Sequence, residues 1–325
     1  MPRHQFIAVV VLFSSITGCS APEPAPAATS AAPATPRPGD PATLVPDAAM
    51  ACDMCGEWNQ PRAPFKVFGN SYFVGTQGLS SVVIATDAGL ALIDVALPQS
   101  APLIDANIRT LGLRTTDIKY ILTSHAHYDH LGGVRSMQRY TRATVLASAS
   151  TAQALGLGHP VPEDPQFGTG PNDAFPAVTD ARVMKDGETI QLGGTTITAH
   201  YTPGHTPGAT TWTWQSCEGT RCLNMVYVDS LTAVSKDGYR YTDHPGLVDS
   251  YRATMAKVAA LPCDVVISTH PSATGMDDKL ARRTAGNLAP GAAGDPFVDA
   301  GACKALAALS LKNLKARVEQ ERQRK

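Results

Sequence analysis

The hydrophobic pattern from about residue 65 onwards alternates short apolar runs with turn signals made of Gly, Pro, Asp and Asn. Short runs rich in Val, Ile and aromatic residues are typical of buried β-strands. The pattern predicts strands at residues 66–74, 81–86, 90–95, 118–123, 144–147, 182–184, 189–192, 195–200, 210–214, 224–228 and 265–269. The second and third of these should form a hairpin around Asp87-Ala88-Gly89.

Longer stretches with apolar residues at helical spacing separate several of these strands. They predict helices at residues 101–111, 131–140, 149–155, 247–261 and 303–319. Residues 156–180 are rich in Gly, Pro and Asp and show no period. Because a loop this long inside a compact domain is usually functional, we expect it to form a wall of the active site. We call residues 156–180 the wall loop.

The densest group of reactive side chains directly follows the predicted strand at 118–123. It consists of His125, His127, Asp129 and His130. In an extended chain, residues i and i+2 point the same way, so the first two histidines can reach one ion while the other two side chains turn towards a second. Imidazole with carboxylate and without thiolate suits zinc, with manganese, iron or nickel as lesser alternatives. A polar loop whose histidines merely cap the following helix is the alternative interpretation.

Two further histidines also follow predicted strands. His205 lies in a Gly/Pro-rich loop, Thr-Pro-Gly-His-Thr-Pro-Gly, and is the natural third ligand for the ion of His125 and His127. His270 lies in the run Ser-Thr-His-Pro at 268–271 and directly follows the strand at 265–269. Sites in sheet-based enzymes form at the ends of strands, so these side chains are expected to converge. The remaining histidines, His4, His159, His200 and His244, belong to no motif and are interpreted as structural or solvated.

The two ends of the domain are marked by composition. Residues 1–19 have the basic start and short apolar run of an export signal, and Cys19 ends a lipobox-like Ile-Thr-Gly-Cys. We therefore expect a periplasmic protein with a possible lipid anchor at Cys19. The apolar run is too short to span a bilayer. Residues 20–50 are dominated by Ala and Pro and predict a flexible linker, which leaves residues 51–325 as one domain.

Charge and cysteine content narrow the possible partners and compartment. The formal net charge is −1 and no basic run is interleaved with aromatic residues, so nucleic acid is not an expected partner. We expect a monomer. Six cysteines remain once Cys19 is set aside, and an even number in an exported chain suggests disulfides. Sequence cannot choose among the pairings, but proximity favours Cys52 with Cys55, Cys217 with Cys222, and Cys263 with Cys303.

The histidine motif, the loop Pro-Gly-His-Thr-Pro-Gly at 203–208 and the run Ser-Thr-His-Pro at 268–271 together resemble the metallo-β-lactamase superfamily. The histidine directly after the motif aspartate, the segment Val-Gly-Thr-Gln-Gly-Leu-Ser-Ser at 74–81 and Leu-Pro-Cys-Asp at 261–264 are similar to subclass B3. The resemblance covers residues 51–325. It implies an α/β fold, an αββα four-layer sandwich with two zinc ions between the sheets, and a disulfide from Cys263 to Cys303.

The resemblance also implies a ligand set. His125, His127 and His205 would hold the first zinc, and Asp129, His130 and His270 the second. At the position taken for Ser230, subclass B1 enzymes place a cysteine ligand and thioester-hydrolysing relatives a bridging aspartate. Serine is too weak a ligand for that duty, and His130 supplies the compensating nitrogen. A slip of one position would instead make Asp229 a bridging ligand, as in the glyoxalase II type.

The predicted reaction is hydrolysis of the β-lactam amide of penicillins, cephalosporins and carbapenems, which would confer antibiotic resistance. Two zinc ions about 3.5–4 Å apart can share a hydroxide, because they lower the pKa of bound water towards 7. Substrate contacts are expected from Ser230, Thr232, Gln166 and Phe167. The alternatives are a dinuclear zinc hydrolase of lactones or thioesters, and a non-catalytic zinc-binding lipoprotein. Trp58 either touches the site or packs in the domain.

Overall fold

The computed structural model describes Met1 and residues 43–169 and 173–324. The expected export signal and Cys19 therefore lie outside the described residues, as does most of the expected linker. Residues 43–50 of that linker contact the domain: Arg139 bonds to Asp47 and to the carbonyl of Val45, and the backbone of Met50 bonds to the Gln99 side chain. Among all the residues that the structure describes, no helix is both long enough and apolar enough to span a bilayer.

The strands of the described residues form two sheets. A seven-stranded sheet has the order β1 to β7, and a five-stranded sheet has the order β12-β11-β10-β9-β8. The strands are β1 (Phe65–Phe68), β2 (Ser71–Phe73), β3 (Val82–Thr86), β4 (Gly89–Ile93), β5 (Ile118–Leu122), β6 (Thr144–Ala147), β7 (Arg182–Val183), β8 (Thr189–Leu192), β9 (Thr195–Tyr201), β10 (Thr210–Glu218), β11 (Arg221–Val228) and β12 (Val265–Ser268).

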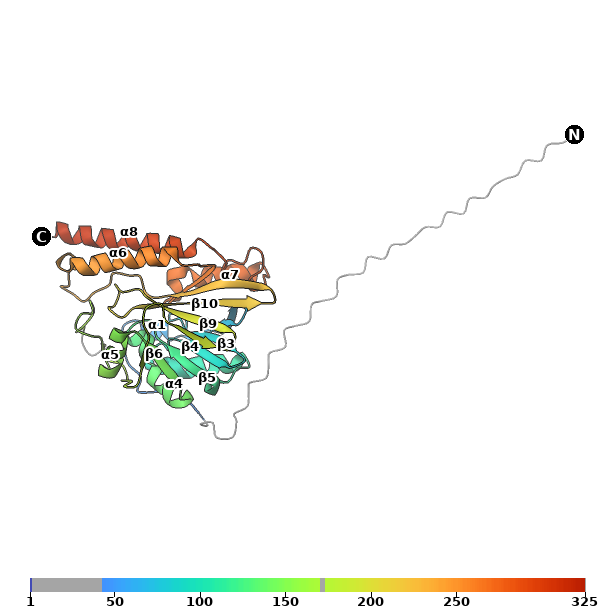
Figure 1. Cartoon of the computed structure of the whole chain (residues 1–325), viewed down its shortest axis with the longest axis horizontal. Helices are drawn as coiled ribbons and strands as arrows, with labels where there is room; N and C mark the ends of the chain where they lie inside the picture. The colour runs from blue at the N-terminus through green and yellow to red at the C-terminus, as the bar shows by residue number, and fades with distance from the viewer. Residues whose placement is uncertain (2–42, 170–172, 325) are drawn as a thin grey trace. The chain divides into compact units, whose positions relative to one another are not determined.

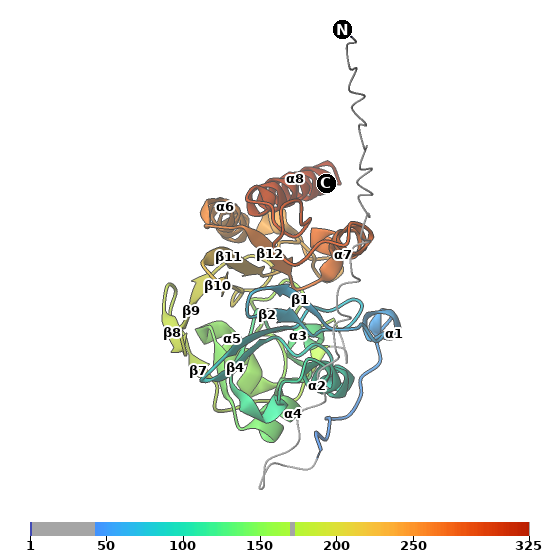
Figure 2. The same ribbon diagram turned by 90° about the vertical axis from the view of Figure 1, so that its right-hand side faces the viewer.

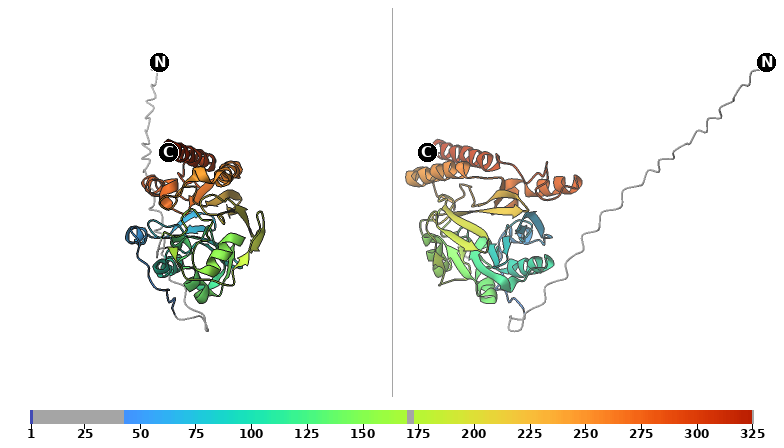
Figure 3. Two further views of the ribbon diagram at one scale, coloured as in Figure 1. Left: turned by 90° about the vertical axis from the view of Figure 1, so that its left-hand side faces the viewer. Right: turned by 45° about the vertical axis from the view of Figure 1, so that its right-hand side comes forward.

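Helices cover the outer face of each sheet (Figures 1 and 2). The helices are α1 (Cys55–Trp58), α2 (Ala101–Thr110), α3 (Tyr128–Leu131), α4 (Val134–Thr141), α5 (Ala149–Leu157), α6 (Pro245–Ala260), α7 (Met276–Ala285) and α8 (Ala302–Gln323). Helices α6 and α8 lie side by side over the five-stranded sheet, while α2 and α4 lie under the seven-stranded sheet (Figure 3). The four-layer sandwich expected from the sequence is therefore confirmed.

Side-chain alternation along the strands explains why the layers stack. On β4, Leu90 and Leu92 pack against the helices outside the seven-stranded sheet, whereas Ala91 and Ile93 belong to the core between the sheets. On β11, Tyr227 joins that central core, and Val226 packs under α6 and α8. Successive residues of a strand point to opposite faces. Because both faces are buried, the strands read as continuous apolar runs and not as alternating ones.

Two predicted elements are divided in the structure. The strand expected at 66–74 is a hairpin of β1 and β2, because Gly69 adopts a left-handed φ of 52° and turns the chain. The helix expected at 131–140 is α3 followed by α4, with Gly132 and Gly133 between them. A Cβ at Gly133 would lie 2.5 Å from the carbonyl oxygen of Val95, so only glycine permits this approach.

Other differences lie in helices that carry little periodic signal. The structure adds α1 and α7, which the pattern does not predict, and extends α8 at its C-terminal end to Gln323. All three disulfides favoured by proximity are formed: Cys52–Cys55, Cys217–Cys222 and Cys263–Cys303. The last of these connects the loop before β12 to the first turn of α8. It therefore fixes the C-terminal helix to the five-stranded sheet.

Candidate metal centre

Five histidines and one aspartate converge where the ends of the two sheets meet. His125 and His127 follow β5, and Asp129 and His130 lie on α3. All four therefore lie just past the C-terminal end of β5 in the seven-stranded sheet. His205 lies in the loop from β9 to β10, and His270 follows β12, both in the five-stranded sheet. The stacking of the two sheets thus brings together residues that are up to 145 positions apart in sequence.

The six side chains form two overlapping groups of potential metal ligands. In the first group, the ligand atoms of His125, His127 and His205 all lie within 4.8 Å of one another. The second group joins Asp129 and His130 to His125 within the same limit. Nε2 of His270 lies 3.3 Å from Oδ2 of Asp129, which adds this histidine to the second group. All six residues are buried except His270, which is partly exposed.

Protein acceptors hold one ring nitrogen on four of the five histidines. Nδ1 of His205 donates to the Thr232 carbonyl at 2.8 Å, and Nδ1 of His270 donates to the Gly78 carbonyl at 3.1 Å. Nδ1 of His125 lies 2.6 Å from Oδ1 of Asp229, and Nε2 of His127 lies 3.1 Å from Oδ2 of Asp164. Metal-binding histidines characteristically use their second nitrogen in this way, because such a bond fixes the tautomer and the direction of the ring.

The opposite nitrogens fit a metal. Nε2 of His125 and both ring nitrogens of His130 are fully buried and have no hydrogen-bond partner. Burying such a group without a partner is costly. Nε2 of His130 lies 3.1 Å from Oδ2 of Asp129, yet the pair does not have hydrogen-bond geometry. Two ligands of one ion approach each other in this manner, so the donor set fits divalent cations.

The pKa values of His125, His205 and Asp129 suit metal binding, whereas neighbouring carboxylates raise the pKa of His127 and His270 despite burial of both rings. Burial and repulsion by His130 hold the pKa of His125 well below its ordinary value, and burial lowers the pKa of His205 to about 3. Burial opposes ionisation of Asp129, but His130 and His270 outweigh it and hold the Asp129 pKa well below its ordinary value. Neutral imidazoles and an ionised carboxylate are the forms that bind a cation.

Behind the histidines, a buried carboxylate connects the two sheets. Asp94 follows β4 and accepts hydrogen bonds from the Ser124 backbone at 2.8 Å, from the Ser124 hydroxyl at 2.6 Å and from the Tyr227 hydroxyl at 2.8 Å. Tyr227 lies on β11 of the other sheet. Fully satisfied buried networks of this kind rigidify a core. Asp94 therefore fixes the backbone immediately before His125.

A cleft of about 240 Å³ opens directly onto the cluster. Its lining includes His127, Asp129, His205 and His270, together with Trp58, Tyr128, Pro160, Gln166, Thr169, Asp173, Ser230, Thr232 and Val234. Three of the substrate contacts expected from the sequence, Ser230, Thr232 and Gln166, thus face the cleft. Phe167 is not among its lining residues, because its ring packs near His159 and under Lys236. Trp58 does reach the site, with its ring centroid 5.3 Å from that of His270.

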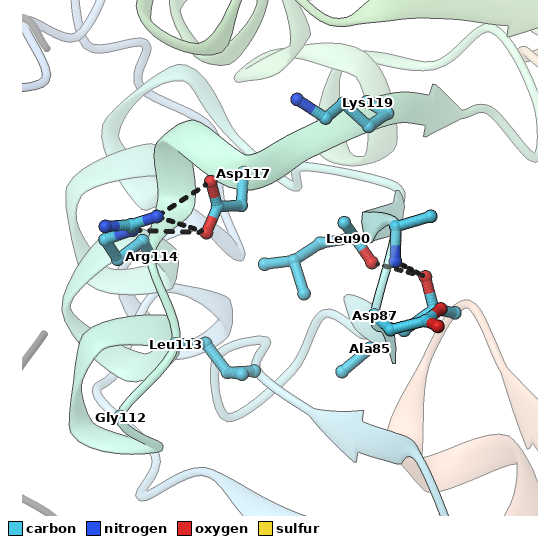
Figure 4. Close-up of a pocket in the computed structure, with 11 residues that line it drawn as sticks. Ala85, Asp87, Leu90, Gly112, Leu113, Arg114, Asp117 and Lys119 are labelled. Carbon is cyan, nitrogen blue, oxygen red and sulfur yellow. Dashed lines mark hydrogen bonds and ion pairs between the residues drawn. The ribbon is translucent and has the colours of Figure 1, made fainter. Parts of the chain in front are cut away.

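A larger hollow of about 550 Å³ lies elsewhere, beside the hairpin of β3 and β4. Figure 4 shows Arg114 and Asp117 at one side of it, already paired with each other at 3.0 Å. None of the converging histidines lines this hollow. The reactive groups therefore belong to the smaller cleft.

Sequence reasoning did not identify the residues that orient the ligands. Asp164 lies in the wall loop, and the length of this loop was the only feature of the sequence that indicated a functional role there. The sequence indicated Asp229 only as a possible bridging ligand. In the structure its Oδ1 is within hydrogen-bond distance of Nδ1 of His125, at 2.6 Å. It belongs to neither group of potential ligands in the described residues. Its position directly after β11 is a signal that could have marked it as part of the site.

Comparisons with known proteins show what the chain as a whole is similar to. The family model described as the metallo-beta-lactamase superfamily matches residues 74–270. Rm3 metallo-beta-lactamase is 44% identical, with a TM-score of 0.79, over 84% of this chain and 100% of that structure. MEM-A1, a subclass B3 metallo-beta-lactamase isolated from a soil metagenome library, is 40% identical, with a TM-score of 0.77, over 82% and 100%.

Matches to curated sequences are shorter. A hydroxyacylglutathione hydrolase of Rhodopseudomonas palustris (strain BisB18) is 31% identical over 121 residues, which is 37% of this chain and 37% of that protein. The chain spans about a third of the length of two curated relatives that it matches. These matches carry less information on substrate than the structures, which align over nearly their full length.

Proposed function

Since the chain belongs to the metallo-β-lactamase superfamily, we propose that it is a zinc-dependent β-lactamase that hydrolyses the amide of penicillins, cephalosporins and carbapenems. The observation that carries the proposal is the buried cluster of five histidines and Asp129. His125 and His130 have unpartnered ring nitrogens in it, and His127, Asp129, His205 and His270 line the adjoining cleft beside hydroxyl side chains. The likeness to subclass B3 enzymes over most of the chain supports it. The broader assignment to metal-dependent hydrolases rests on the family itself.

We assign two zinc ions to the two groups of ligands. His125, His127 and His205 would hold the first, and Asp129, His130 and His270 the second. Bound there, zinc would supply a shared hydroxide at neutral pH and polarise the lactam carbonyl. The chain's own contribution is to present imidazoles and one ionised carboxylate in fixed directions, because the remaining ring nitrogens of four histidines are bonded to the protein.

Side chains beyond the ligands orient the substrate and the nucleophile in this proposal. Asp129 remains ionised and can accept a hydrogen bond that directs the attacking oxygen, besides its role as a ligand. The hydroxyls of Ser230 and Thr232 can donate to the substrate carboxylate, and Gln166 can contact its substituent from the wall loop. Phe167 would support this wall through its backbone, since its carbonyl accepts a hydrogen bond from Lys236 at 2.8 Å.

The direct test is an assay of the purified protein with added zinc against a penicillin, a cephalosporin and a carbapenem, with and without chelator. A lactone and a glutathione thioester are assayed in parallel, because the similarity to hydroxyacylglutathione hydrolase raises that alternative. Chelator-sensitive hydrolysis of β-lactams is the expected result. Turnover of the thioester alone would contradict the proposal, and zinc binding without any turnover would favour the non-catalytic alternative.

Replacing Ser230 with Ala is expected to raise KM for a carbapenem roughly 10- to 150-fold while changing kcat less than about 3-fold. A hydrogen bond from a hydroxyl to a carboxylate contributes about 1.5–3 kcal/mol, and here it would act on ground state and transition state alike. Steady-state kinetics measure the split between the two constants. Ser235→Ala is the matched control, since the Ser235 hydroxyl bonds to Arg317. Unchanged kinetics in the Ser230 variant would remove this residue from substrate binding.

Replacing Asp229 with Asn distinguishes a subclass B3 enzyme, in which Asp229 orients His125, from a hydrolase of the glyoxalase II type, in which Asp229 would bridge two metals. If Asp229 only orients His125, the amide oxygen can still accept from Nδ1, and activity should fall about 10- to 100-fold. Both zinc ions should remain bound at micromolar metal. If Asp229 bridged two metals, the variant would lose zinc as well as activity. Zinc content after gel filtration measures the difference, with Asp237→Asn, an exposed carboxylate, as the control.

We also propose that the protein is located in the periplasm. The export signal expected at residues 1–19 would deliver the enzyme to the periplasm, where β-lactams act, with Cys19 as a possible lipid anchor. We propose that it works there as a monomer. Expression in a periplasm-competent host should raise the inhibitory concentration of a carbapenem only when the signal is intact.

A further inference from the structure

One buried carboxylate of the wall loop contacts the candidate metal centre. Asp164 lies in the segment between α5 and β7, far in sequence from every predicted ligand. Its side chain is almost fully buried, with 2% of the residue exposed. Oδ2 lies 3.1 Å from Nε2 of His127. Because Nε2 is engaged by this carboxylate, Nδ1 is the nitrogen that His127 can offer to a metal.

The second oxygen of the same carboxylate shapes the wall loop. Oδ1 of Asp164 accepts a hydrogen bond from the backbone N–H of Gln166 at 2.8 Å. The Asp164 carbonyl in turn accepts from the N–H of Phe167 at 3.0 Å, which closes a turn. Side-chain bonds of Asp to the backbone two residues on are a common way to stabilise turns. The turn holds Gln166 at the lining of the cleft.

We propose that Asp164 is a positioning residue that couples the wall loop to the first metal group. One oxygen fixes the ring of His127, and the other fixes the turn that carries Gln166. The inference rests on the metal-binding part of the proposed function and not on the choice of β-lactam. Loss of the carboxylate should therefore weaken metal binding and substrate binding together, although Asp164 touches neither metal nor the cleft.

Lys236 also holds the wall loop, but through contacts that involve no histidine of the cluster, so it can be compared with Asp164. Lys236 bonds through Nζ to the Phe167 carbonyl at 2.8 Å, and through its backbone N–H to the Pro165 carbonyl at 3.0 Å. Its ammonium also lies over the Phe167 ring. Lys236 belongs to the loop that follows β11, and its hydrogen bonds hold the same turn that the Asp164 side chain stabilises. No hydrogen bond or ion pair described for Lys236 involves a histidine of the cluster.

The test compares Asp164→Asn, Lys236→Met and Asp180→Asn in the full exported protein. Asparagine matches aspartate in shape, but it has a single acceptor oxygen. In either orientation its NH₂ group faces one of two N–H donors, on His127 or Gln166, so one bond is lost. Asp180 is an exposed wall-loop carboxylate bonded to Gln138, which makes Asp180→Asn the matched control. Zinc affinity is measured by competition with a chromophoric chelator, and KM and kcat by steady-state kinetics.

We expect Asp164→Asn to weaken one zinc site about 10- to 100-fold and to raise KM. Lys236→Met should raise KM while leaving zinc affinity within about 2-fold of the unsubstituted protein, and Asp180→Asn should change neither. Unchanged zinc affinity in Asp164→Asn would overturn the coupling. Equal losses of affinity in Asp164→Asn and Lys236→Met would also overturn it, because loop order alone would then explain the effect. A parent protein that binds no zinc would instead refute the metal centre on which the inference rests.

Discussion

Replacing His205 with Ala should lower kcat/KM for every β-lactam substrate by about a thousandfold or more. His205 is the one member of the first ligand group supplied by the five-stranded sheet, and Nδ1 is bonded to the Thr232 carbonyl, which leaves Nε2 to face His125 and His127. Removing that nitrogen leaves two histidines for the first ion. Without a properly held zinc, water near the substrate keeps a pKa far above neutrality and is a poor nucleophile.

The measurement combines zinc content with hydrolysis of a carbapenem followed by absorbance. His200→Ala is the matched control, because His200 lies on β9 five positions earlier and bonds to Thr213 on the neighbouring strand at 2.8 Å. It is not among the lining residues of the cleft, so its loss should leave zinc content and activity nearly unchanged. A His205 variant that retained full zinc and activity would show that the ligand assignment is wrong.

The convergence of His125, His205 and His270 could be anticipated from sequence because each follows a short apolar strand. Sites in sheet-based enzymes form where strands end, so a position just past a strand predicts a place near the site. Asp164 gave no such signal. It lies in a loop without period, and its orientation towards His127 depends on a tertiary contact that no local pattern encodes. Residues that orient ligands are therefore harder to predict than the ligands themselves.

The same contrast holds for the fold. Strands such as β4 and β12 were predicted because burial on both faces makes them almost entirely apolar. The hairpin at Gly69 was missed because apolar residues continue on both sides of the turn. Helix α7 was missed because few of its residues are apolar: within it, only Met276 and Arg283 are buried. Its position depends on polar contacts, and periodicity in hydrophobic residues does not report these.

Arg283 attaches α7 to the rest of the domain through buried polar contacts. Its guanidinium forms two hydrogen bonds to the carboxylate of Asp295, at 2.9 and 2.7 Å, and donates to the carbonyls of Lys66 and Val67 on β1. Both charged side chains are buried, with exposures of 7% and 0%. The Asp295 oxygens also accept from backbone N–H groups, at Gly291 and Phe297. The pair thus joins three separate segments within the protein interior.

Replacing Asp295 with Ala should destabilise the domain by about 3–5 kcal/mol, because it leaves the Arg283 guanidinium buried without its counter-charge. For a domain of this size the loss corresponds to a fall in Tm of roughly 5–10 °C. Urea unfolding followed by circular dichroism measures the change, with the disulfides intact. Asp278→Ala, at an exposed position on the same helix, should cost less than about 1 kcal/mol. Asp295→Asn should fall between the two, since the amide keeps one acceptor but not the charge. Equal stability of the Asp295 and Asp278 alanine variants would show that the pair is dispensable and that apolar packing alone holds α7.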